Sequence, residues 1–250
     1  MDCDLAGFYR ELLATPEGQA HALTLQVYAE EGDEGAILDQ LVERVEEPRL
    51  NRLVRQHRDD EVRHAELFRG CLTRLGLDPQ PLPDELRVIR HLAQKVGGFA
   101  VALDSVDEWV IAGVYALLLA TEERGIEVYT VIAEAFASVD PETAETYRRV
   151  ICDERRHTSY CRTIGRKYAV TDDAWEEIVA ATKIVEAEAY AEYQAANVSY
   201  CTDNGLVRRG ARRGRRTWLG GEEVIVHYDD VPAKEVTTVR GSRARRRSAQ

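Results

Sequence analysis

The sequence DEVRH at residues 60–64 recurs as DERRH at residues 153–157. Both copies lie in segments whose apolar residues recur at helical spacing. Because helical residues three apart point to the same side, the Glu and the His of each copy can offer one oxygen and one nitrogen to a common ion. A single E-x-x-H arises often by chance, whereas average residue usage predicts the five-residue motif in only about one chain per thousand. Two copies in one chain therefore indicate two metal-binding helices.

Proline, glycine and capping residues divide the chain around these copies into helical segments. A proline fits only the first turn of a helix, so Pro48 and Pro141 mark the starts of the two helices that carry the motifs. Strand-like alternation is nearly absent before residue 222. We expect helices over residues 4–14, 18–46, 48–76, 84–96, 105–138, 141–168 and 173–199.

The long helices form two hairpins joined by a connection of about 28 residues, the layout of a four-helix bundle built from a duplicated unit. The sequence therefore predicts an all-α fold, with a four-helix bundle and additional helices over residues 1–205. Residues 206–250 are rich in arginine and are expected to form a basic, flexible tail, in which residues 222–228 could add a strand.

Charge is distributed unevenly along the chain. The tail carries 12 basic and 5 acidic residues, so residues 1–205 hold a net charge of −18 within a total of −11. An acidic body argues against nucleic-acid binding by the folded part, whereas a bundle lined with carboxylates would carry such a charge. No run approaches the roughly 20 apolar residues of a membrane helix, and the first residues lack a signal-peptide pattern, so we expect a cytoplasmic protein with no membrane partner.

The five cysteines form no C-x-x-C pair and predict neither a disulfide framework nor a thiolate zinc site. We expect Cys71, Cys152 and Cys161 to be small buried residues, as free cysteines commonly are.

The other carboxylate ligands should come from the helix that precedes each motif in its hairpin. On the helix over 105–138, Glu122 lies within the apolar stripe and Glu123 beside it, and a buried carboxylate without a partner would be costly. On the helix over 18–46 we favour Glu31, because it lies about as far before the turn as His64 lies after it. Glu34 and Glu30 are the alternatives.

Paired E-x-x-H helices, each preceded by a helix with an inward glutamate, resemble the ferritin-like di-iron carboxylate proteins. The full D-E-x-R-H motif resembles their oxygen-activating branch: multicomponent monooxygenases, acyl-carrier-protein desaturases and ribonucleotide reductase small subunits. The resemblance covers residues from about 20 to 168 and implies a ferritin-like bundle. The ligands would be Glu31, Glu61, His64, Glu122, Glu154 and His157.

In oxygen-activating members, the aspartate before each E-x-x-H accepts a hydrogen bond from the metal-bound histidine of the other repeat, and an arginine stabilises that aspartate. Such a contact fixes the direction of the histidine ring. Carried over to this chain, Asp60 would orient His157, Asp153 would orient His64, and Arg63 and Arg156 would support the aspartates. By contrast, we expect His57 to be a packed, hydrogen-bonded residue, because a lone inner histidine is more often structural than a ligand.

Carboxylate-rich sites with two histidines favour iron or manganese over zinc, so the expected cofactor is two iron ions (Fe2+/Fe3+), with manganese as the alternative. The resemblance implies a non-haem di-iron oxygenase or oxidase that uses dioxygen to oxidise an organic substrate. Its electrons would come from a separate donor, its substrate pocket would be walled by residues 84–96 and 173–199, and a homodimer would be compatible with the fold.

The alternatives are a ferroxidase or iron store, a rubrerythrin-like peroxide reductase, and a metal-free structural bundle. The long connection between the hairpins argues against a ferritin, and the missing C-x-x-C module argues against a rubrerythrin. A metal-free bundle leaves an inward Glu122 without a reason.

Overall fold

The structure is a computed structural model and describes residues 5–30, 35–95, 108–208, 215–219 and 222–226. It confirms the predicted all-α bundle. The helices are α1 (Leu5–Leu12), α2 (Pro16–Tyr28), α3 (Gly35–Arg44), α4 (Pro48–Leu75), the 3-10 helix η2 (Asp84–Leu86), α5 (Val88–Lys95), α7 (Glu108–Phe136), α8 (Pro141–Tyr168) and α9 (Asp172–Asp203).

The helices that carry the motifs begin and end where the local sequence stabilises a terminus. Pro48 opens α4, and the Glu47 carboxylate accepts hydrogen bonds from the first free backbone N–H groups. Gly76 ends α4 in the left-handed conformation, at a φ of 67°. Pro141 opens α8 in the same way, behind the Asp140 cap. These bounds agree with the predicted helices over 48–76 and 141–168.

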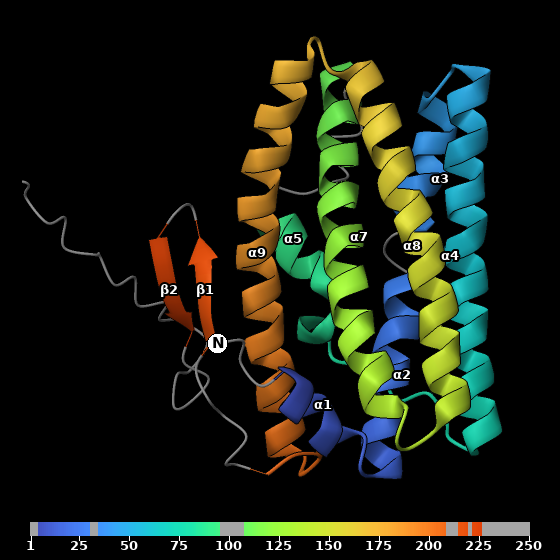
Figure 1. Cartoon of the computed structure of the whole chain (residues 1–250), viewed down its shortest axis with the longest axis vertical. Coiled ribbons are helices and arrows are strands. Elements are labelled where there is room, and N and C mark those ends of the chain that lie inside the picture. The colour runs from blue at the N-terminus through green and yellow to red at the C-terminus, as the bar shows by residue number, and fades with distance from the viewer. Residues whose placement is uncertain (1–4, 31–34, 96–107, 209–214, 220–221, 227–250) are drawn as a thin grey trace, which may run out of the picture.

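Helices α2, α3 and α4 form one side of the bundle, and α7 and α8 form the other (Figure 1). α4 packs against α8, while α9 covers α7 and carries α5 on its surface. β1 (Arg215–Leu219) and β2 (Glu222–Val226) form an antiparallel hairpin beside α9, so a strand is present over part of the predicted 222–228 segment. Residues 227–250 of the tail lie outside the described residues.

The core is divided by a polar layer. On α7, Ile111 and Leu119 belong to one buried cluster and Val128 and Phe136 to another, and Glu122 lies between them. On α4 and α8, residues 57–64 and 154–157 separate the same two clusters. The bundle therefore holds its polar side chains at one depth, between two apolar halves that keep the helices together.

The predicted continuous helix over 18–46 is wrong in the described residues. α2 ends at Tyr28, Ala29 and Glu30 form a π-helical turn, and α3 begins at Gly35. The run EEGDEG at 30–35 combines two glycines with four carboxylates, which disfavours an uninterrupted α-helix. Because a π turn inserts an extra residue into the helical repeat, it changes which side chain faces the bundle.

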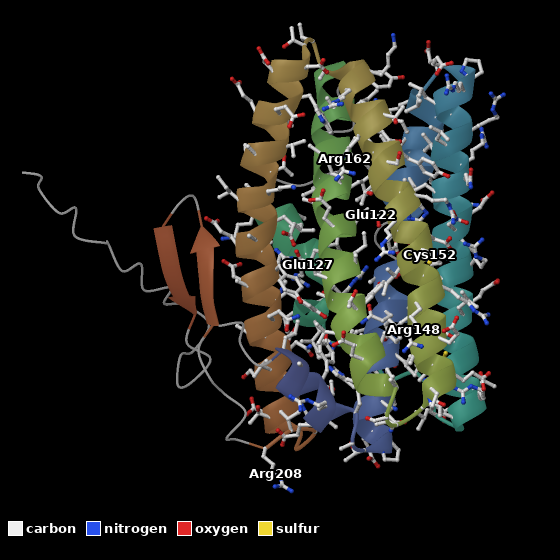
Figure 2. All side chains as sticks on the ribbon, viewed as in Figure 1. Glu122, Glu127, Arg148, Cys152, Arg162 and Arg208 are labelled. Atoms are coloured by element: carbon white, nitrogen blue, oxygen red, sulfur yellow. The ribbon has the colours of Figure 1, made fainter. Side chains whose placement is uncertain are left out.

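One predicted core residue lies on the surface. Cys71 and Cys161 are buried as expected, but Cys152 is exposed on the outer side of α8 (Figure 2). Two residues before the inward Glu154, Cys152 points to the opposite side of the helix, so its position in the helical repeat outweighs its apolar character. Among the described helices, none combines the length and the apolar composition that crossing a lipid bilayer requires.

Candidate metal centre

Seven buried side chains meet in the polar layer, and they come from α4, α7, α8 and the π turn after α2. They fall into two sets, and in each set one nitrogen or oxygen atom per residue lies within 4.8 Å of the others. We call them the His57 group (His57, Glu61, Glu122 and His157) and the Glu30 group (Glu30, Glu61, His64 and Glu154).

The two groups are joined by the glutamates of the two motifs. Glu61 belongs to both groups. Glu154 lies between the two motif histidines, with one oxygen 2.8 Å from His157 Nδ1 and the other 3.4 Å from His64 Nδ1. If each group held a metal ion, Glu61 and Glu154 would be the carboxylates within reach of both.

Atoms in the His57 group lie close together without hydrogen bonding. His57 Nε2 lies 2.6 Å from Glu122 Oε1 and 3.3 Å from Glu61 Oε1, yet all three atoms are buried and have no hydrogen-bond partner among the described residues. Buried polar atoms are normally paired, and a cation shared by a nitrogen and two oxygens would satisfy all three. The donor set therefore fits a metal ion.

Each motif histidine turns Nδ1 towards the centre and Nε2 towards an aspartate of the other motif. His64 Nε2 lies 3.2 Å from Asp153 Oδ2, and His157 Nε2 lies 3.2 Å from Asp60 Oδ2. An Nε2–H group that donates to these carboxylates leaves the Nδ1 lone pair free for an ion. The structure thus brings together the pairs that the resemblance implied.

Two arginines hold these aspartates from the surface. Arg63 Nη2 lies 2.5 Å from Asp153 Oδ2 and 2.8 Å from Asp60 Oδ1, and Arg156 forms ion pairs with the same two aspartates. Burial raises the pKa of Asp60, but the hydrogen bond from His157 and the charge of Arg63 bring it down to about 2. Asp60 is therefore a carboxylate at neutral pH, as an acceptor for His157 must be.

Four carboxyl groups share the buried layer, and their ionisation is strongly perturbed. Burial and the nearby charge of Glu61 raise the pKa of Glu30 to about 8. Burial also raises the pKa of Glu154, reinforced by Glu122 and Glu61. Burial acts in the same direction on Glu122, but the contacts with His57 and His157 together outweigh it and lower the pKa to about 2. Such crowding of like charge is costly without compensating cations.

Tyr129 fixes the orientation of the Glu30 carboxylate. Its buried hydroxyl donates a hydrogen bond to Glu30 Oε1, while Glu30 Oε2 lies 3.3 Å from His64 Nδ1. The Tyr129 ring is held between Phe68 and Tyr147, in edge contacts with centroid distances of 6.0 and 5.5 Å. With Oε1 held by Tyr129, the Oε2 atom of Glu30 faces His64 in the centre.

The structure places most of the predicted ligands together. Glu61, His64, Glu122, Glu154 and His157 all lie in the two groups. Glu122 lies midway along α7 (Figure 2), whereas Glu123 turns outward to Arg162 and Lys183.

The two remaining members of the groups are Glu30 and His57. Glu30, one of the alternatives for this helix, belongs to the Glu30 group, and Glu31 and Glu34 lie outside the described residues. His57, expected to be a hydrogen-bonded core residue, has no hydrogen-bond partner among the described residues and belongs to the His57 group instead. The spacing of His57, Glu61 and His64 along one helical face is the sequence signal that points to it.

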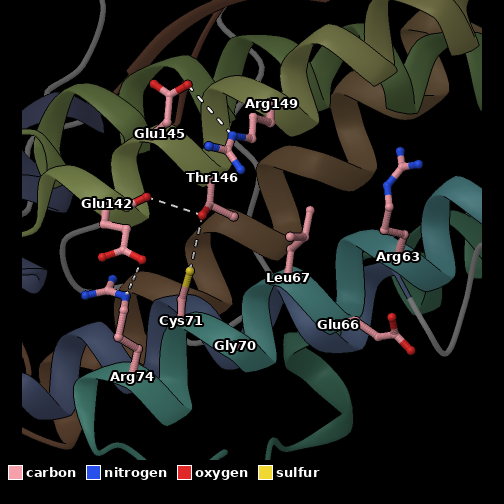
Figure 3. A pocket seen from close by; sticks show the side chains of 10 residues that line it. All are labelled: Arg63, Glu66, Leu67, Gly70, Cys71, Arg74, Glu142, Glu145, Thr146 and Arg149. Carbon is pink, nitrogen blue, oxygen red and sulfur yellow. Dashed lines mark hydrogen bonds and ion pairs between the residues drawn. The ribbon is translucent and has the colours of Figure 1, made fainter.

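A groove of about 400 Å³ runs along the outer surface between α4 and α8 (Figure 3). It begins at Arg63, behind the aspartates, and ends near the Arg74–Glu142 pair. Its lining residues are Arg63, Glu66, Leu67, Gly70, Cys71, Arg74, Glu142, Glu145, Thr146 and Arg149, without any of the seven clustered side chains. On the other side of the bundle, α5 and α9, the expected walls of a substrate pocket, pack on α7 through Leu92, Ala189 and Leu117. That pocket stays a prediction.

The sequence and the fold were compared with known proteins. No protein-family model, no curated protein and no solved structure matches the chain. The buried carboxylate and histidine clusters in an all-helical bundle are compatible with a ferritin-like fold and identify the chain as a candidate metal-binding protein.

Proposed function

We propose that the chain is a ferritin-like di-iron oxidoreductase that uses dioxygen to oxidise or oxygenate an organic substrate, with electrons from a separate donor. The observation that carries the proposal is the reciprocal bracing of His64 by Asp153 and of His157 by Asp60, around two ligand groups that share Glu61. A purely structural ion-pair network gives no reason for both histidines to turn one nitrogen to an aspartate and the other to the centre.

The donor set supports iron. Four carboxylates and three imidazoles suit iron or manganese better than zinc, which prefers four-coordinate sites rich in nitrogen and sulfur. Two iron ions held there would supply the electrons that reduce dioxygen.

The protein side chains would prepare the site in three ways. Asp60 and Asp153 hold the Nε2 protons of the two histidines, which keeps each Nδ1 directed at the centre. The Tyr129 hydroxyl orients Glu30. The apolar clusters on either side exclude water, which strengthens every interaction of the buried charges.

Iron loading and dioxygen uptake test this proposal. The full chain, loaded anaerobically with Fe2+, should bind two ions and then consume about one molecule of dioxygen per site, stopping until a reductant is added, because the iron stays bound and cycles. A ferroxidase or store would continue to oxidise added Fe2+ and would accumulate mineral inside a shell of many subunits. Size measurement during the titration separates the two, and a large assembly that takes up tens of irons per chain would overturn the oxygenase proposal.

A further inference from the structure

His57 has the surroundings of a ligand and not those of a packed core residue. The chain offers an internal comparison, because His21 is equally buried, with 1% of its surface exposed. His21 Nε2 lies 2.8 Å from Asn197 Oδ1 in a hydrogen bond, and its ring stacks on Tyr200. His57, by contrast, has both ring nitrogens buried and without a hydrogen bond among the described residues, and its Nε2 atom lies within ion-pair distance of two carboxylate oxygens.

The position of His57 makes the two ion positions unequal. The His57 group contains two imidazoles and two carboxylates, whereas the Glu30 group contains one imidazole and three carboxylates. Imidazole favours iron, cobalt and zinc, and carboxylate favours harder ions such as manganese. The affinities of the two positions for one metal should therefore differ.

We propose that His57 is a metal ligand and that it makes the His57 group the tighter of two unequal ion positions. This inference rests on the proposed metal centre and adds a seventh ligand to it. It also predicts the order of loading, because a first equivalent of an imidazole-preferring ion fills the His57 group before the Glu30 group.

His57 is supported differently from the other two histidines. Its Nδ1 atom meets no aspartate in the described part of the chain, and its ring is held by stacking on His157 at a centroid distance of 3.9 Å. His157 and the carboxylates remain when His57 is removed, so its loss should weaken the tighter position without abolishing binding there.

Cobalt titration tests the inference without reference to turnover. Metal-free full chain is titrated anaerobically with Co2+ against a competing chelator, for the wild type, His57→Gln and the control His21→Gln. The wild type should bind two ions in two resolved steps. His57→Gln should lower the affinity of the first step by at least roughly 10–100-fold, which is the cost of losing a residue that supports a ligand. His21→Gln should leave the affinities of both steps unchanged.

A second measurement needs no variant and so does not depend on how a variant folds. In the proton spectrum of the wild-type protein with two bound Co2+ ions, each coordinated imidazole contributes one strongly shifted, exchangeable N–H signal. Three such signals are expected, whereas two would show that His57 does not coordinate.

The possible results separate this inference from the proposed function. Two equal binding steps, or a His57→Gln variant with unchanged steps, would overturn the inference and leave the di-metal centre standing. A wild-type protein that binds no cobalt and no iron would overturn both. If three imidazole signals appear but the di-ferrous protein does not react with dioxygen, His57 is a ligand and the oxidase proposal is wrong.

Discussion

Asp60 Oδ2 lies 3.2 Å from the Nε2 atom of His157, which is 97 residues away on the facing helix. Asp153 holds His64 in the same manner, so each D-E-x-R-H motif braces the histidine of the other. The contact requires α4 and α8 to lie at one relative depth, and it ties the packing of the bundle to the direction of its candidate ligands.

Removing the charge of these aspartates should weaken the site and spare the fold. Asp60→Asn and Asp153→Asn take away no core volume, but they remove the carboxylate that holds each Nε2 proton, so metal affinity should fall roughly 10–100-fold. Chelator competition measures the affinity and circular dichroism checks the helices. Asp59→Asn is the control, because Asp59 is 71% exposed. Wild-type affinity in both variants would show that the bracing has no bearing on metal binding.

Adjacent glutamates on α7 should behave differently. Glu122→Ala should lose at least one of two bound ions, because Glu122 is 4% exposed and belongs to the His57 group. Glu123→Ala should retain both ions, because Glu123 forms outward ion pairs with Arg162 and Lys183. Elemental analysis after iron loading decides between them, and equal iron content in the two variants would contradict the assignment.

The ligand beside the π turn can be identified by the same approach. Glu30→Gln should weaken one of the two binding steps, because Glu30 lies 3.3 Å from His64 Nδ1. Glu31→Gln should change neither step. Titration with Fe2+ under anaerobic conditions compares the two variants. If Glu31→Gln were the one to lose affinity, the helical phase of a continuous helix would be right and the π turn would not select the ligand.

His21 should make stability depend on pH. Burial lowers the pKa of His21 below its ordinary value of 6.5, and the hydrogen bond to Asn197 opposes this only in part. The folded state therefore favours the neutral ring. Its stabilising effect is complete above about pH 6.5 and is lost as pH falls through the folded-state pKa, with a slope of at most about 1.4 kcal/mol per pH unit.

Urea unfolding of the wild type and His21→Gln between pH 7.5 and pH 5 measures this contribution. The buried histidines of the metal centre titrate in both proteins, so the difference between the two slopes isolates His21. The free energy of unfolding of the wild type should fall more steeply with acid than that of the variant. Identical slopes would mean that His21 is charged or solvated in the folded protein.

Much of this molecule can be read from the sequence because the relevant signals are local. Pro48 and Pro141 open the two motif helices, and the i, i+3 spacing alone puts Glu61 beside His64 and Glu154 beside His157. The phase of Glu122 within an apolar stripe is equally local, since it depends only on the regular turn of α7.

The remaining choices depended on how the helices meet. His57 shares a helical face with Glu61, but the approach of Glu122, 2.6 Å from its Nε2 atom on another helix, follows only from how the helices pack. Glu30 lies in the cluster where the helix changes its repeat at Ala29, which no count along a regular helix reveals. Periodicity within one helix indicates which residues share a face. The rotation and depth of each helix against its neighbours follow from the packing of the apolar clusters. That rotation and depth decide which faces meet at the centre.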